Sequence, residues 1–171
     1  KHSLSTGFLA TWYDFRYKQV FNQDEQIALK ETPSLYSVYL QDHWKPASVA
    51  SIRVGLRANH FTEQGGLRIE PRGSFSYQFK PKWRFKAGGG AYTQYLQFVS
   101  TEAFSGSDFW VPLDDTVDPG RSWQAVTGLE YEASDRYKYS IEGYYTDMSN
   151  LVVIDQGVAV DTEGSTSEDV F

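Results

Sequence analysis

Several residue types that carry chemistry in other proteins are absent or sparse in this chain of 171 residues. It contains no cysteine, which excludes disulfides and thiolate metal sites. The three histidines, His2, His43 and His60, are far apart, and none of their spacings is typical of metal ligands. The sequence therefore gives no support for catalysis, and we expect no enzyme activity, no metal and no cofactor.

Long apolar runs are also lacking. No stretch of about 18 apolar residues exists, so the sequence predicts no transmembrane helix. The net charge of −6 disfavours nucleic acid as a partner, because phosphate binding needs a basic surface. What is abundant is aromatic: 16 % of the residues are Phe, Trp or Tyr. Such a composition suits the strands of outer-membrane barrels, whose aromatic girdles mark both membrane interfaces.

Alternating apolar and polar residues predict an all-β chain with about seven strands and part of an eighth. The clearest alternation is that of Ile52 and Val54 with Arg53 and Arg57. No segment has a convincing helical pattern. The predicted strands are 3–15, 35–44, 49–60, two strands within 71–94, 122–132 and 137–147.

The predicted connections alternate between short and long. Short turns are expected at Lys45-Pro46-Ala47, Lys80-Pro81-Lys82 and 133–136, and long loops at 16–33, 61–68 and 93–121. Outer-membrane barrels combine short periplasmic turns with long extracellular loops. Strands of about ten residues are also long enough to cross a bilayer at a tilt. The pattern predicts an antiparallel up-and-down segment of a transmembrane β-barrel.

Aromatic residues stand at both ends of the predicted strands and are expected to form two membrane girdles. The residues beside the short turns, at the periplasmic interface, are Trp44, Phe79, Trp83, Tyr131 and Tyr137. Those near the long loops, at the outer interface, are Trp12, Phe61, Tyr92 and Trp123.

The charged residues of the predicted strands, Arg53, Arg84 and Glu142 among them, share the parity opposite to the aromatics. In a membrane barrel they would line a polar lumen. Two alternatives remain open at this point. A soluble β-sandwich that binds carbohydrate would turn the aromatics inward, and a porin-type barrel would have the same alternation.

The long loop 93–121 is the best candidate for ligand contact, because it carries exposed aromatics beside acidic residues and loops often carry function. An alternative is that 109–112 anchors the loop on itself. The candidate ligand-binding residues of this loop and of the outer lumen are Arg57, Asn59, Tyr92, Gln94, Tyr95, Phe109, Trp110 and Arg121.

Three further features have structural interpretations. Glu130 and Glu142 are expected to pair with lumen lysines and arginines rather than to act as a catalytic pair. The run Gly88-Gly89-Gly90 lies inside a strand, which indicates a bend or a close backbone approach rather than a phosphate loop. The acidic stretch 161–169 is expected to be an extracellular loop.

Four segments resemble the barrel of TonB-dependent outer-membrane receptors. They are YSVYLQDHWKP (36–46), IEPRGSFSYQFKPKWRFKAGGGAYTQ (69–94), DPGRSWQAVTGLEYE (118–132) and YSIEGYYTDMSNLVV (139–153). In that family a strand like YLQDxW precedes a short turn, and an EPR-S-SY strand leads into an aGyG-Y-Q strand. The order and spacing of the segments agree over about 35–154.

The resemblance implies a barrel of about 22 strands that encloses a plug. Residues 1–171 would be about a third of its wall, and the plug, the TonB box and the other strands lie outside this sequence. The implied function is TonB-dependent uptake of a scarce nutrient, such as siderophore-bound iron, cobalamin or an oligosaccharide. The implied location is the outer membrane of a Gram-negative-type cell, and the implied partners are lipid, plug, TonB and ligand.

Overall fold

The computed structural model describes residues 1–21, 24–99 and 109–151. All the regular elements within these ranges are β-strands. None of them is a helix that could cross a membrane.

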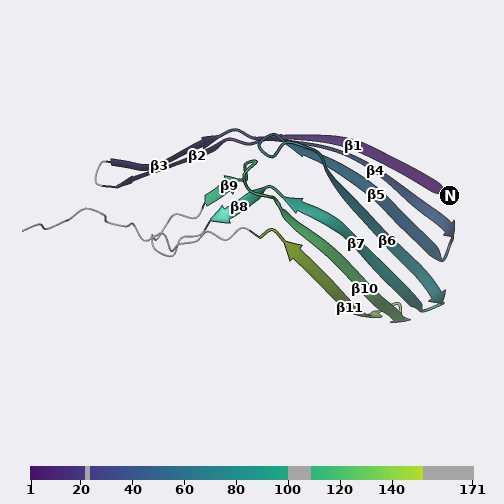
Figure 1. The fold of residues 1–171 in the computed structure, drawn as a ribbon. Helices are drawn as coiled ribbons and strands as arrows, with labels where there is room; N and C mark the ends of the chain where they lie inside the picture. The colour runs from purple at the N-terminus through teal and green to yellow at the C-terminus, as the bar shows by residue number, and fades with distance from the viewer. Residues whose placement is uncertain (22–23, 100–108, 152–171) are drawn as a thin grey trace, which may run out of the picture.

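Seven long strands form one antiparallel sheet in the order β1-β4-β5-β6-β7-β10-β11. Figure 1 shows them side by side in a single curved layer. Each strand pairs with its neighbour along most of its length, so the seven predicted strands are confirmed. Their bounds are β1 His2–Trp12, β4 Ser34–Ala47, β5 Ala50–Phe61, β6 Arg68–Lys80, β7 Trp83–Gln94, β10 Gly120–Ser134 and β11 Tyr137–Ser149.

The three short turns all lie at one end of the sheet (Figure 1). Two of them occupy 81–82 and 135–136, within the predicted segments. The third was predicted at Lys45-Pro46-Ala47 and is instead at 48–49, because β4 continues through Pro46 to Ala47. The register shifts between Trp44 and Ala47, which marks a bulge. A bulge tolerates proline, since its missing N–H is not needed by the ladder there.

Two of the long connections contain hairpins that the sequence did not predict. The predicted loop 16–33 contains β3 (Asp24–Glu31) and all of β2 (Phe15–Phe21) except its first residue. The predicted loop 93–121 contains β8 (Leu96–Val99) and β9 (Phe109–Pro112). Each hairpin is a separate two-stranded sheet. Both lie beyond the end of the main sheet opposite the short turns (Figure 1). We call this the long-loop end.

The register gives the seven-stranded sheet one apolar and one polar face. Phe75 stands opposite Ala87 and Tyr77 opposite Phe85, while Ser76 stands opposite Lys86. The same separation continues into β5, where Ile52 stands opposite Phe75. Large apolar side chains on the first face are exposed, and Val54, Leu56 and Ile141 are among them. Within the described residues no second sheet covers either face, so the expected alternative of a β-sandwich is wrong.

Buried apolar side chains gather only at the long-loop end of the part of the chain that the structure describes. Phe61 is 1 % exposed, Tyr95 6 % and Leu113 7 %. We call these three residues the rim cluster. Pro33 and Pro119, which adjoin β4 and β10, are also fully buried. The middle of the sheet has no apolar core of its own.

Candidate site on the polar face

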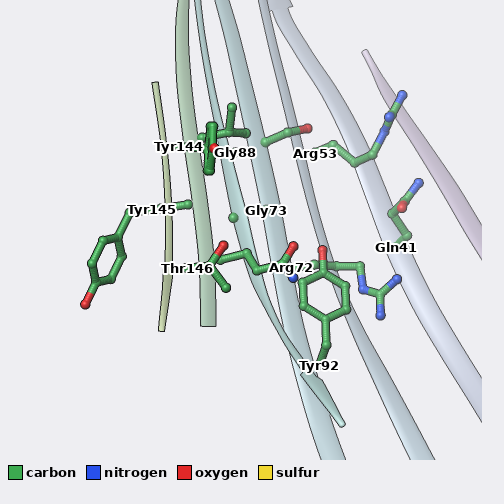
Figure 2. A pocket seen from close by; sticks show the side chains of 14 residues that line it. Gln41, Arg53, Arg72, Gly73, Gly88, Tyr92, Tyr144, Tyr145 and Thr146 are labelled. Atoms are coloured by element: carbon green, nitrogen blue, oxygen red, sulfur yellow. The ribbon is translucent and has the colours of Figure 1, made fainter. Parts of the chain in front are cut away.

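A hollow of about 530 Å³ opens on the polar face across the middle strands (Figure 2). Arg53, Arg72 and Tyr92 line it from β5, β6 and β7, and Tyr144 lines it from β11. Glycines from β6 and β7 form its floor. At Gly89 an added Cβ would lie 2.6 Å from the Gln124 carbonyl oxygen, so the backbones approach too closely for a side chain. The expected close approach at the glycine run is thereby confirmed.

Glu70 organises the outer part of this face. The residue is 5 % exposed, and its carboxylate accepts a hydrogen bond from the Thr93 backbone N–H at 2.9 Å. The other carboxylate oxygen contacts Arg72 Nη2 at 3.1 Å. The Arg72 guanidinium lies 5.4 Å from the centre of the Tyr92 ring, a cation–π contact (Figure 2). These contacts fix Arg72 and Tyr92 at the edge of the hollow.

A second network joins Ser37, Arg57 and Asn59. The Ser37 hydroxyl donates to Asn59 Oδ1 at 2.7 Å. Arg57 donates from Nε to Asn59 Oδ1 and from Nη2 to Ser37 Oγ, both at 2.9 Å. Ser37 and Asn59 are buried, so these bonds satisfy polar groups that water cannot reach. Arg57 and Asn59, predicted to bind ligand, already have partners within the wall.

Glu130 bridges two lysines across three strands. Its carboxylate contacts Lys86 Nζ on β7 and, at 3.2 Å, Lys138 Nζ on β11. Because the residue is only 8 % exposed, the cations compensate a charge held away from water. The expected pairing with cations of the polar face is confirmed for Glu130 but not found for Glu142. Glu142 is exposed and makes no ion pair within the described ranges.

Three other predicted ligand residues lie where β7 meets β10. Tyr92 and Gln94 are on the polar face, and the Gln94 side chain donates to the Leu96 carbonyl at 2.8 Å. Arg121 stands opposite Thr93 and shares the parity of Trp123, so it lies on the apolar face. The expectation that Arg121 faces the lumen is wrong, because side chains change face at every residue along a strand.

The predicted residues of the long loop have different surroundings. Tyr95 is buried and its ring stacks on Phe61 with centroids 5.0 Å apart, so it faces the rim cluster and not solvent. Burial, and then the Glu70 carboxylate, raises the pKa of Tyr95. Trp110 is exposed and packs against Phe98 at 5.2 Å. Phe109 begins β9. Residues 100–108 of this loop, and the acidic stretch 161–169, lie outside the described residues.

Aromatic residues beside the short turns form contacts along the apolar face. Trp83 packs on Tyr131 at 4.6 Å and on Phe79 at 6.4 Å. Trp44 stacks on His2 at 5.5 Å, and Tyr137 is exposed. This arrangement fits the predicted periplasmic girdle, whose position in a membrane stays a prediction.

Of the four residues predicted for the outer girdle, two lie on the apolar face and two do not. Trp12 and Trp123 are exposed on the apolar face, as a girdle requires. Phe61 and Tyr92 were assigned wrongly. Phe61 is buried in the rim cluster, and Tyr92 lies on the polar face beside Arg72. Both residues have the parity of the polar face, Phe61 with Asn59 in β5 and Tyr92 with Lys86 in β7, so the alternation itself excludes them from the apolar face.

No group of three or more His, Cys, Asp or Glu side chains in the described ranges is arranged to hold a metal ion. What the site offers is a polar wall with fixed arginines, and an exposed apolar surface behind it.

Comparison with known proteins agrees with this two-faced wall. The family model of the TonB dependent receptor-like β-barrel matches residues 2–167, and the chain belongs to that family. Members of this family are receptors of the outer membrane. No curated protein matches the chain.

A solved structure gives the same fold. The chain is similar to a mutant of the ferric enterobactin receptor of Pseudomonas aeruginosa, with a TM-score of 0.57 and 16 % identity. The similarity covers 72 % of this chain and 19 % of that receptor. At this identity the likeness concerns the fold alone. The family that the chain belongs to is one of receptors.

Proposed function

We propose that this chain is part of the wall of a TonB-dependent outer-membrane receptor that takes up a scarce nutrient. The separation of the two faces is the observation that carries the proposal. An exposed apolar face rich in aromatics suits contact with lipid, and a charged opposite face suits a polar lumen. We propose that Val54 and Ile141 face the hydrocarbon region, with Trp44, Trp83 and Tyr131 at the periplasmic interface and Trp123 at the outer one.

The two edge strands support a larger assembly. Within the described residues β1 and β11 each pair on one side only, which leaves a row of backbone groups along the other side without a strand partner there. A lipid bilayer offers no water to satisfy such groups, so spanning sheets are closed. The strands that close this sheet would come from the rest of the receptor, and the nineteen per cent coverage of the similar receptor agrees with that.

The polar face offers contacts to a plug. Arg53 and Arg84 make no ion pair within the described residues, whereas Arg72, Lys86 and Lys138 have acidic partners. An arginine left without a partner in an enclosed lumen is costly. We propose that carboxylates of the plug domain pair with Arg53 and Arg84 when the barrel is complete.

Ligand contact is proposed for exposed residues towards the long-loop end. Tyr92, Gln94 and Trp110 stay candidates because their side chains are exposed. Arg57 and Asn59 would first have to release their bonds within the wall, and Tyr95 would serve to position the loop. The nutrient would be a ferric siderophore, cobalamin or an oligosaccharide.

Uptake measurements test the proposal. Cells that lack the receptor are compared with cells that express it, each with and without TonB, and are given radiolabelled ferric siderophores, cobalamin and oligosaccharides. We expect one of these to accumulate only when receptor and TonB are both present. Uptake that persists without TonB, or the absence of uptake for all three classes, would contradict the proposed function.

A further inference from the structure

The two hairpins at the long-loop end share one support. The β2–β3 hairpin leaves the sheet between Tyr13 and Pro33, where the Tyr13 N–H donates to the Pro33 carbonyl at 2.9 Å. The β8–β9 hairpin leaves it between Tyr95 and Leu113, where the Leu113 N–H donates to the Tyr95 carbonyl at 2.9 Å. Each hairpin therefore has a tyrosine and one cross-strand bond at its base.

Both base tyrosines contact the same buried ring. Phe61 stacks on Tyr95 at 5.0 Å and meets Tyr13 edge-on at 6.5 Å. Tyr13 in turn stacks on Phe15, the first residue of β2, at 5.7 Å. Four rings thus form a continuous path from one hairpin base to the other. Since Phe61 is 1 % exposed, a shift of either tyrosine must be taken up by its neighbours.

The residues that follow Phe61 form hydrogen bonds to both hairpin bases. The Thr62 N–H donates to the Ser34 carbonyl at 3.0 Å, and the Ser34 N–H donates to Thr62 Oγ1 at 2.9 Å, beside the base of β2–β3. On the other side, the Gln64 side-chain amide donates to the carbonyls of Asp114 and Val117, just after β9. We call residues 61–64 the bracket.

We propose that the bracket couples the two hairpins, so that ordering or displacing one changes the motion of the other. Coupling of this kind needs a physical element that both sites act on, and the bracket bonds to both bases. The inference concerns the long-loop end itself and does not depend on which nutrient is bound.

A reversible staple provides the test, in the complete receptor in lipid nanodiscs. Gln97 and Val111 are directly opposite in β8–β9, so Gln97→Cys with Val111→Cys allows a disulfide across that hairpin. This chain has no cysteine of its own. Amide hydrogen exchange is then followed in residues 15–31 in the oxidised and the reduced protein, which serves as its own reference.

We expect oxidation to slow exchange in 15–31 by about threefold or more, as a local opening coupled to the stapled hairpin becomes rarer. The coupling must be reciprocal. Arg16→Cys with Lys30→Cys, an opposite pair in β2–β3, should therefore slow exchange in 96–99.

Two variants test whether the coupling between the hairpins depends on the bracket. Gln64→Ala and Phe61→Leu should each abolish most of the effect of the staple. Gln78→Ala is the matched control, because the Gln78 side chain donates to the Pro81 carbonyl at the opposite end of the sheet, and it should leave the effect unchanged. A staple without effect on 15–31 would overturn the proposal. An effect of the staple that survives in Gln64→Ala and Phe61→Leu would also overturn it. Such a result would indicate that the coupling runs through direct contact between β2 and β9, since these strands approach each other.

Discussion

The long-loop end and the middle of the sheet are stabilised in different ways. At the long-loop end, the rim cluster and the bracket bury apolar rings and satisfy backbone groups within the chain. In the middle, the side chains of both faces stay exposed or half-exposed, apart from a few paired polar groups such as Glu130. Among the described residues the long-loop end has an interior of its own, whereas the middle of the sheet has none, and under the proposed function lipid and the contents of the lumen would cover it.

Phe61→Ala should give the largest loss of stability, because it removes a buried ring and leaves a cavity. The expected loss is about 3–5 kcal/mol in the free energy of unfolding of the complete receptor, measured by urea titration in lipid. Phe75→Ala on the apolar face is the matched control. Lipid chains can fill the space it leaves, so its loss should be clearly smaller, and equal losses would remove the distinction between the two regions.

Val54→Arg tests the assignment of the apolar face of the sheet. A positive charge on the lipid face near the membrane midplane costs about 2–4 kcal/mol in a transmembrane barrel. Gln41→Arg, on the polar face opposite Gly55, should change the unfolding free energy by less than about 1 kcal/mol. If the two arginines had the same effect, the assignment of the faces would be wrong.

Glu130→Gln probes the paired charges of the polar face. The substitution removes the charge that Lys86 and Lys138 share, and we expect a loss of about 1–2 kcal/mol once solvent screening of the half-exposed lysines is considered. The control is Glu142→Gln, at an exposed carboxylate without an ion pair in the described ranges, which should change stability by less than about 0.5 kcal/mol. The urea unfolding midpoints of the wild type, Glu130→Gln and Glu142→Gln measure this difference.

Tyr95→Phe should have the smallest effect, and only at high pH. Because burial raises the pKa of Tyr95, its neutral form is favoured in the folded protein. The stability that follows is fully present below the unfolded tyrosine pKa of about 10 and is lost as the pH rises through the folded value. Hydrogen exchange at the hairpin bases should therefore accelerate at alkaline pH in the wild type and less so in Tyr95→Phe. Identical pH profiles would contradict this role of burial.

The regular part of the fold follows from the sequence, because alternation fixes the strands and the turns fix their order. In β5, side chains alternate between the two faces of the sheet, so a register that places Ile52 on one face places Arg53 on the other. The prediction failed where strands end. Phe61 was placed in a girdle because it is aromatic and lies near a loop, but contacts with Tyr13 and Tyr95 decide its environment. Those residues are 48 and 34 positions away in the sequence, so local patterns do not reveal these contacts. The alternation alone could have excluded Phe61 from the apolar face, because it has the parity of Arg57 and Asn59.

Two other features could not be predicted for related reasons. The hairpins β2–β3 and β8–β9 pair only within themselves and not with the main sheet, so the turn-and-loop pattern that orders the seven long strands does not reveal them. Alternation places the predicted ligand residues Tyr92 and Gln94 on the polar face, and Tyr92 lines the hollow there, while their contact with a ligand stays a prediction. The role of Glu70 was missed, because its partners are the backbone of Thr93 and the neighbouring Arg72, which a charge pattern does not reveal.

Site-directed spin labelling along β5 tests the two-faced wall most directly. Single labels are placed in the complete receptor in lipid, at Ile52, Val54 and Leu56 and at Ser51, Arg53 and Arg57. Their collision rates are measured with oxygen, which concentrates in lipid, and with a water-soluble nickel complex. The account predicts that labels at 52, 54 and 56 collide mainly with oxygen and that those at 51, 53 and 57 do not. Equal oxygen contact at all six positions, or the reverse pattern, would contradict it.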